Sequence, residues 1–274
     1  MTRLPDFRLE TYFSRWEFTA RHHLTASDAQ TMTLTGLLAL ADDQDRAAFE
    51  NLSLGYTETY GDPALREAIA QSYERANAAD VICFAGAEEA LYLAMNVLLD
   101  AGDHAVVVTP NYQAAETVPL ALCEVTGVAL DPDRDWALDL DQIKAAIRPN
   151  TRVVSVNFPN NPTGKIIDAA DLAGLARLCD EQGIHLFSDE VYRGLERDPA
   201  RTLPQAADLS ERALCEELAA RGQHARPAAA DTPVGLLLEK PVERPDDAIT
   251  VVDLTGVGAL GAAVASAVLR ELTR

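Results

Sequence analysis

The residue of this sequence that most clearly indicates chemistry is Asp189, which ends the apolar run Ile184–Phe187. A carboxylate in such a place is costly to bury unless a cationic partner compensates its charge. We therefore interpret Asp189 as the partner of a positively charged ligand atom. Tyr192, three residues further along, adds a hydroxyl that can donate a hydrogen bond to the same ligand.

Two further candidates follow other strand-like segments. Tyr112 comes after Ala105–Thr109 and Pro110, where its ring could stack on a planar ligand. A half-buried core tyrosine is the alternative interpretation. Asn161 lies in the turn after the segment 152–158, where its amide could donate to a ligand oxygen. A turn asparagine that bonds its own backbone is the alternative there.

A possible anion site lies at Gly86-Ala87-Glu88, where a helix is predicted to begin. The first N–H groups of a helix have no partner inside it, and the helix dipole favours negative charge at this end. Gly86 would let a phosphate approach the backbone closely because glycine has no side chain. An ordinary helix start after a loop is the alternative.

Helical and strand-like segments alternate along most of the chain, which predicts the elements that must position these side chains. The helix that Gly183 ends shows Leu172, Leu175, Ala176 and Cys179 at the spacing of one buried face. The alternation predicts a three-layer α/β/α fold with a mainly parallel sheet, whose ligands bind at the carboxyl ends of the strands. The other helices are predicted at 64–76, 87–99 and 140–147, and the strands at 105–109, 152–158 and 184–188.

Composition excludes several classes of function. The chain has 274 residues, 48% of them apolar, and a formal net charge of −20. Such an acidic protein is a poor partner for nucleic acid or for an anionic membrane surface.

Its four cysteines form no C-x-x-C pair, which argues against zinc or another metal and against a disulfide framework. No apolar leader follows Met1, so we expect a cytoplasmic protein.

Four motifs occur together in one order, and together they resemble the large domain of class I/II aminotransferases. These enzymes have the fold type I architecture and use pyridoxal 5′-phosphate (PLP). The likeness runs from about Leu9 to about Leu214 and implies an incomplete fold type I large domain. It divides the chain into an arm at 1–55, a PLP-binding-type domain at 56–214 and a different segment at 215–274. The motifs are Tyr60–Arg66, Ala85–Ala90, Asn157–Gly164 and Ser188–Tyr192.

The resemblance assigns a role to each candidate residue. It implies that Gly86, Ala87 and Glu88 hold the cofactor phosphate and that Tyr112 stacks on the pyridine ring. Asp189 would pair with the pyridine nitrogen and keep it protonated, while Asn161 and Tyr192 would donate to the phenolic oxygen. Tyr60 resembles a tyrosine that reaches the phosphate of the neighbouring subunit, which implies a homodimer. The family transfers an amino group between an amino acid and a 2-oxo acid.

The lysine that forms the Schiff base with PLP in these enzymes has no match. The sequence contains only Lys144, Lys165 and Lys240, and none lies in a segment like the family's lysine motif. Lys240 is a weak candidate because it follows the strand-like segment 234–238. We therefore expect a lysine-less, inactive or truncated homologue. The alternatives are an active enzyme that uses Lys240 or a partner's lysine, and a non-catalytic protein that reuses the cleft for another ligand.

The last part of the sequence resembles a different family. Residues 248–259 and the predicted helix that follows are similar to the C-terminal end of ornithine cyclodeaminase/μ-crystallin-type proteins. Gly256, Gly258 and Gly261 form a G-x-G-x-x-G pattern, but no strand with an acidic residue about 20 positions further on follows it. We expect a strand-to-helix turn here and no dinucleotide site. A chimeric or truncated reading frame would explain the change of resemblance.

Overall fold

The computed structural model describes residues 4–21 and 32–215 of the chain. Five strands form one sheet, in the order β2-β1-β3-β4-β5, and every neighbouring pair is parallel. The sheet with its flanking helices confirms the predicted α/β class. The expected strand and helix of 215–274, including Lys240, lie outside the described residues apart from Cys215. The strands are β1 (His104–Thr109), β2 (Glu124–Ala129), β3 (Thr151–Asn157), β4 (His185–Asp189) and β5 (Ala213–Cys215).

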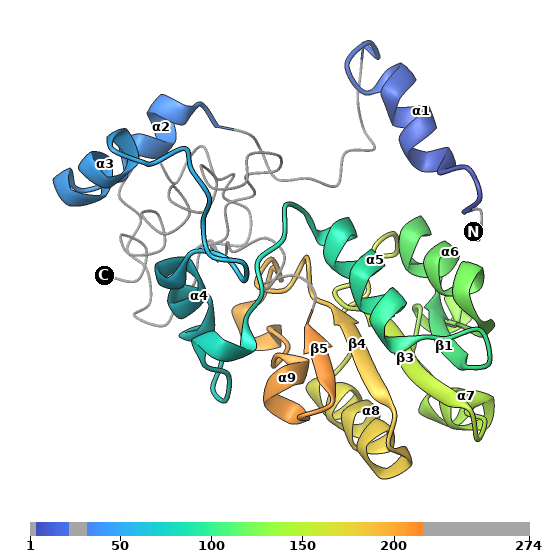
Figure 1. Ribbon diagram of the computed structural model, residues 1–274. Coiled ribbons are helices and arrows are strands. Elements are labelled where there is room, and N and C mark those ends of the chain that lie inside the picture. The colour runs from blue at the N-terminus through green and yellow to red at the C-terminus, as the bar shows by residue number, and fades with distance from the viewer. Residues whose placement is uncertain (1–3, 22–31, 216–274) are drawn as a thin grey trace.

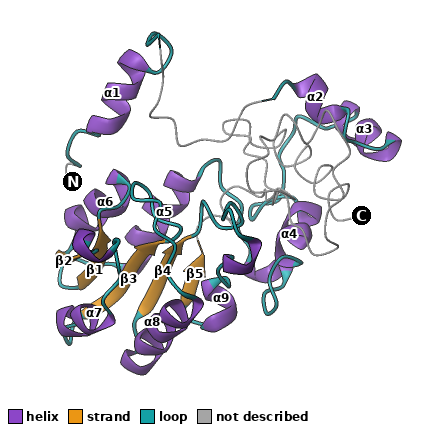
Figure 2. Ribbon diagram, turned by 180° about the vertical axis from the view of Figure 1, so that it is seen from behind, coloured by secondary structure: helices purple, strands orange, loops and turns teal. Residues whose placement is uncertain are grey.

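Helices cover both faces of the sheet. In Figure 1, α5 (Ala87–Leu98) and α6 (Gln113–Leu122) lie together on one face. Figure 2, seen from behind, shows α7 (Leu140–Ala146) and α8 (Ala169–Gln182) on the other, with α9 (Ala206–Leu209) beside β5. Parallel strands need such crossover helices, which return the chain to the same edge of the sheet.

Side chains on the two faces of the sheet pack into two separate hydrophobic cores. On β1 and β3, Val106 and Val154 pack with α7 and α8, whereas Ala105 and Val153 pack with α5 and α6. Successive side chains of a strand point to opposite faces, so adjacent residues enter different cores. The four residues predicted for the buried stripe of α8 are all buried, as expected.

In the described residues of the N-terminal part, three helices precede α4 (Pro63–Ala70). They are α1 (Arg8–Trp16), α2 (Leu34–Leu38) and α3 (Asp43–Glu50). Helix α4 has Asp62 as its N-cap and Pro63 in its first turn. Short 3₁₀ turns occur at Ala78–Asp80, Pro132–Arg134 and Pro199–Arg201.

The predicted helix 64–76 is wrong at its C-terminal end, because α4 stops at Ala70. The physical reason is a competing acceptor from a distant part of the chain. The backbone N–H groups of Glu74 and Arg75 both donate to Asp208 Oδ1, each at 3.0 Å. In a longer helix these amides would donate to backbone oxygens of the preceding turn. Here they donate to Asp208 instead, and the helix ends before them. The sequence reading also missed α6, β2 and β5.

Candidate functional site

Buried asparagines tie the ends of the central strands together. Asn157 and Asp189 are register partners at the carboxyl ends of β3 and β4. The Asn157 amide donates to the backbone oxygen of Asp189 at 3.1 Å, and its Oδ1 accepts from the Asn161 N–H at 2.6 Å. Asn157 thus fixes the start of the turn that carries Asn161 relative to the strand that carries Asp189.

Asp189 and the residues after it form one compact group with this turn. The Asp189 side chain is buried, with 7% of the residue exposed, and its Oδ1 accepts from the Val191 N–H at 3.0 Å. The Asn161 amide lies 3.4 Å from the Tyr192 hydroxyl, to which it donates. The structure therefore brings three of the predicted site residues, Asn161, Asp189 and Tyr192, to one edge of the sheet.

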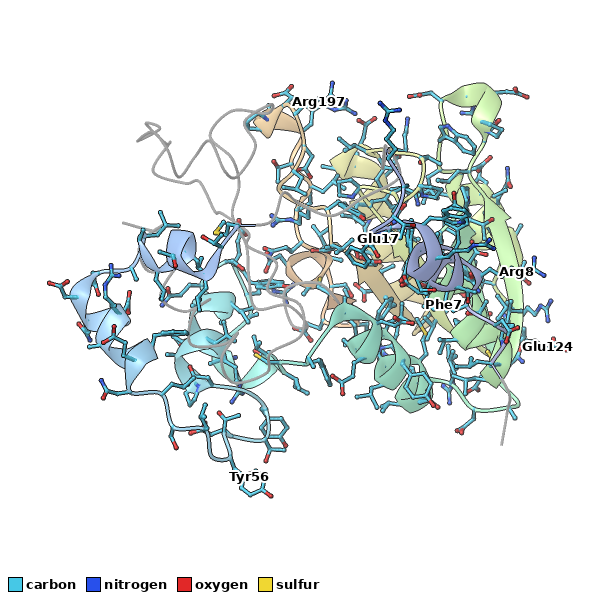
Figure 3. All side chains as sticks on the ribbon, turned by 90° about the horizontal axis from the view of Figure 1, so that it is seen from above. Phe7, Arg8, Glu17, Tyr56, Glu124 and Arg197 are labelled. Atoms are coloured by element: carbon cyan, nitrogen blue, oxygen red, sulfur yellow. The ribbon has the colours of Figure 1, made fainter. Side chains whose placement is uncertain are left out.

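Tyr112 lies at the same edge and is held by the N-terminal helix. Its hydroxyl donates to Glu10 Oε1 at 3.0 Å, and its ring packs edge-on against Phe7, with the centroids 5.4 Å apart. Figure 3 shows Phe7 where α1 lies over the sheet domain. Burial, the hydrogen bond to Glu10 and the charges of Glu10 and Glu88 raise the pKa of Tyr112, with a smaller contribution from Tyr192. The pKa of Tyr112 therefore depends both on Glu88 at the start of α5 and on Tyr192 after β4.

The sequence predicts an anion site at the start of α5. Gly86 is the N-cap and offers no side-chain cap, and a Cβ added to it would meet no atom within 4 Å. Space is therefore open above the free N–H groups of the first turn. Glu88 lies in this turn, where partial desolvation and the Glu10 carboxylate raise its pKa. A phosphate here would be held by backbone amides, with two carboxylates nearby.

Tyr60 stands apart from the other candidates. It is 56% exposed, and the Arg66 guanidinium lies over its ring at 5.5 Å from the centroid. No described contact joins Tyr60 to Asp189 or to the start of α5. In this single chain its ring faces Arg66 and solvent.

Neither described lysine lies in the group around Asp189. Lys144 is exposed on α7, and Lys165 forms an ion pair of 3.0 Å with Asp135. Within residues 4–21 and 32–215, His, Cys, Asp and Glu form no cluster of three that could hold a metal ion. In the same ranges, no helix combines the length and apolarity needed to cross a membrane.

A large, mostly apolar cavity of the described residues does not coincide with the predicted site. It measures about 680 Å³ and is lined by mostly apolar residues of β5, α5 and the segment after α4, including Leu93, Val97 and Leu214. Asn161, Asp189 and Tyr192 do not line it. A polar reaction needs convergent polar groups, so the carboxyl edge and not this apolar groove is the candidate site.

Sequence reasoning assigned no individual role to three supporting residues. Asn157 joins two strand ends, and Asn160 does the same for β1, because its amide donates to the Pro110 oxygen at 3.1 Å. Glu190 is buried, and its Oε1 accepts from the Ala206 N–H at 2.8 Å and from Cys215 Sγ at 3.2 Å. Burial raises the pKa of Glu190. Polar residues at the ends of apolar runs were the available signal.

Comparison with known proteins identifies the family. The model of aminotransferase classes I and II matches residues 24–217. The match covers more than half of the chain and includes the whole described sheet, so this protein belongs to the class I and II aminotransferase family. The enzymes of this family depend on PLP.

Relatives with assigned activities match the same part of the chain. An aspartate/prephenate aminotransferase of Thermus thermophilus is 34% identical over 161 residues, which are 55% of this chain and 42% of that protein. An aspartate aminotransferase of Geobacillus stearothermophilus is 36% identical over 161 residues, 57% of this chain and 41% of that protein. The chain therefore spans less than half the length of these relatives.

Solved structures agree on the fold. A PLP-dependent aminotransferase from Streptococcus suis superposes with a TM-score of 0.77 at 22% identity, over 99% of this chain and 73% of that one. An aminotransferase from Mycobacterium tuberculosis gives a TM-score of 0.71 at 26% identity, over 98% and 71% of the two chains. The first likeness shows the architecture alone.

The described residues fit PLP. The cofactor needs a phosphate seat, a partner for its pyridine nitrogen and donors to its phenolic oxygen. The uncapped, open start of α5 suits the phosphate, and the buried Asp189 suits a protonated ring nitrogen. The adjoining amide of Asn161 and hydroxyl of Tyr192 suit an anionic oxygen.

Proposed function

We propose that this chain binds PLP non-covalently at the carboxyl edge of the sheet and does not catalyse transamination by itself. The supporting observation is the connected group of Asn157, Asn161, Asp189 and Tyr192, in which each side chain is held by the next or by the strand ends. Such pre-ordered polar groups bind a charged ligand with little reorganisation.

Each residue has a defined task in this proposal. Asp189 would pair with the ring nitrogen, and Asn161 and Tyr192 would donate to the phenolic oxygen. Gly86, Ala87 and Glu88 would hold the phosphate through their backbone amides, and the Tyr112 ring would stack on the cofactor. When bound, PLP supplies an electron sink for the breaking of bonds at the α carbon of an amino acid.

The absence of catalysis follows from the lysines. An amino-group transfer needs a base that moves a proton at the substrate α carbon, and a positioned base contributes about 10²–10⁴-fold to the rate. Lys144 is exposed on α7 and Lys165 is paired with Asp135, so neither is available to the site. Lys240 lies outside the described residues and does not match the family's motif.

Borohydride reduction in the presence of PLP tests this proposal. We expect a PLP absorption band that is lost on dialysis after reduction, with no pyridoxyl group on any single lysine by peptide mass mapping. An adduct on Lys240 that disappears together with transaminase activity in Lys240→Ala would overturn the proposed inactivity. Lys144→Ala is the control, because it removes an exposed lysine of α7. A chain that shows no PLP band at all would overturn the binding proposal itself.

Family resemblance supports two wider proposals. The protein would reside in the cytoplasm and retain affinity for amino acids and 2-oxo acids, the substrates of the family. It would also form a homodimer, with Tyr60 reaching the phosphate site of the other subunit. The exposure of the Tyr60 ring supports this arrangement. Light scattering after size-exclusion chromatography tests the dimer, and a monomer at micromolar concentration would contradict it.

A further inference from the structure

The apolar groove of about 680 Å³ lies beside β5, the strand at one edge of the described sheet. In Figure 1, β5 ends the row of strands on the side of α4. The walls of the groove come from β5, from one face of α5 and from the segment 81–84. Large apolar side chains of all three walls are exposed, among them Ile82, Leu93, Val97 and Leu214. Exposed apolar side chains gathered in this way mark a surface on which a further segment or molecule packs.

Within the described part of the chain, the backbone on both sides of the groove has hydrogen-bonding groups without partners. Strand β5 pairs with β4 on one side and with no described strand on the other. Across the groove, the backbone groups of Ile82 and Phe84 form no hydrogen bond with any described residue. An edge strand offers its free N–H and C=O groups to a strand that comes alongside. The groove therefore provides backbone partners as well as apolar surface for a further strand.

The polar side chains around the groove are engaged with one another or with near neighbours. Arg75 forms an ion pair of 3.1 Å with Glu211, and the Ser210 hydroxyl donates to Asp180. Asp80 accepts from the N-cap residue of its own short turn, as part of a capping box. Because these groups already have partners, the lining offers few convergent donors or acceptors to a small polar ligand. An apolar segment of chain is the better occupant.

The chain itself supplies a segment of that kind. Cys215, the last residue of β5, lines the groove, and the sequence continues from it through residues 216–274. Residues 249–252 are Ile-Thr-Val-Val, which are all β-branched and favour a strand. Only one of the residues 248–254 is charged, which suits a strand that is covered on both faces.

We infer that residues 248–254 form a further strand of the sheet, which lies between β5 and the segment 81–84 and fills the groove. The connection 216–247 is long enough for either strand direction, because a parallel crossover needs only about a dozen residues. Since the segment is tethered to the wall that it covers, its local concentration there is high. The other strand-like segment, 234–238, suits the place less, because it contains a glycine and three leucines. The inference is independent of PLP binding and of the proposed function.

Hydrogen exchange followed by mass spectrometry tests the inference on the full chain. We expect Val251→Asp, which puts a charge into the proposed strand, to speed exchange at least about tenfold in peptides covering 248–254 and β5. Leu236→Asp is the matched control, because it puts the same charge into the segment 234–238. In that variant β5 should exchange as it does in the unaltered chain. Exchange in β3, which β4 separates from β5, verifies that each variant is folded.

Photo-crosslinking locates the segment while its own sequence stays unchanged. The photoreactive residue p-benzoylphenylalanine, placed in the groove instead of the partly exposed Leu93 of α5, should crosslink to residues 248–254. Placed instead of the exposed Leu120 of α6, which does not line the groove, it should give no such crosslink. A mixture of isotope-labelled and unlabelled chains distinguishes a crosslink within one chain from a crosslink between two chains.

Three results would overturn the inference. The first is exchange in β5 that Leu236→Asp speeds and Val251→Asp does not, because 234–238 would then be the occupant. The second is a crosslink from position 93 that joins labelled to unlabelled chains, because a second copy would then fill the groove. The third is no crosslink from position 93 to 248–254, because the groove would then be open or bound by another molecule. If faster exchange in β3 shows that Val251→Asp does not fold, the crosslink from position 93 decides.

Discussion

The Tyr112 hydroxyl donates a hydrogen bond of 3.0 Å to Glu10, a residue 102 positions earlier in the chain. The contact is reinforced on both sides, since Phe7 packs against the Tyr112 ring and Gln113 bonds the backbone of Asp6 and Leu9. Helix α1 therefore sets the position of the aromatic ring that we propose to stack on PLP. An N-terminal arm thereby takes part in the geometry of the site.

Replacing Glu10 with glutamine should lower the pKa of Tyr112. The Glu10 carboxylate accepts a hydrogen bond from the protonated hydroxyl and would repel a phenolate. Both effects favour the protonated form of Tyr112. Spectrophotometric titration of the tyrosines at alkaline pH measures the change, with Tyr112→Phe to assign the signal. Glu67→Gln on α4 is the control. An unchanged Tyr112 titration in Glu10→Gln would show that burial alone raises the pKa.

Asp189→Asn should weaken PLP binding by about ten- to a hundredfold while the fold is kept. The amide oxygen can still accept from the Val191 N–H, so the local turn should persist. What is lost is the negative charge that favours a protonated ring nitrogen, and charged hydrogen bonds are worth about 1.5–3 kcal/mol. Fluorescence titration with PLP measures the affinity. Asp141→Asn, at the exposed start of α7, should bind PLP as the unaltered chain does.

The buried His104 should make the protein less stable as the pH falls below 6.5. Its ring nitrogens lie 2.7 Å from Thr151 Oγ1 and 2.9 Å from Thr126 Oγ1, which links β1 to both of its neighbouring strands. Burial, helped by the Arg148 guanidinium, lowers the pKa of His104 below the usual 6.5. Between that lowered pKa and 6.5, the unfolded chain binds a proton that the folded chain does not, so the free energy of unfolding decreases as the pH falls.

Denaturant unfolding at a series of pH values between about 5 and 8 measures this effect. The free energy of unfolding of His104→Gln should depend less steeply on pH than that of the unaltered chain. His185→Gln is the matched control, because His185 is partly exposed at the start of β4. Equal slopes for His104→Gln and the unaltered chain would contradict the prediction, whatever the absolute stabilities.

Gly61→Ala should destabilise the fold by roughly 1–3 kcal/mol. Gly61 has φ +106°, a left-handed conformation that favours glycine, and a Cβ built there would lie 2.6 Å from the Cβ of Cys83. Urea unfolding measures the loss. Gly102→Ala is the control, since its added Cβ would meet nothing within 4 Å and its φ is not left-handed. A Gly61→Ala chain as stable as Gly102→Ala would show that this turn rearranges freely.

Local patterns in the sequence determined the kind of several central elements, among them α5, α8, β1, β3 and β4. The buried stripe of α8 depends on residues within a few helical turns, so it can be read without a structure. The same holds for Asp189, whose charge at the end of an apolar run predicts a site at the edge of the sheet. Its burial and its place beside Asn157 agree with that interpretation.

Only the tertiary structure decided which distant groups meet. Asp208 captures the amides of Glu74 and Arg75 and ends α4, and Glu10 reaches Tyr112 across more than a hundred residues. Strand β5 has three residues and is defined by its pairing with β4, so no local pattern marks it. A hydrogen bond between remote segments depends on where packing places them, and periodicity within a segment carries no information about that placement.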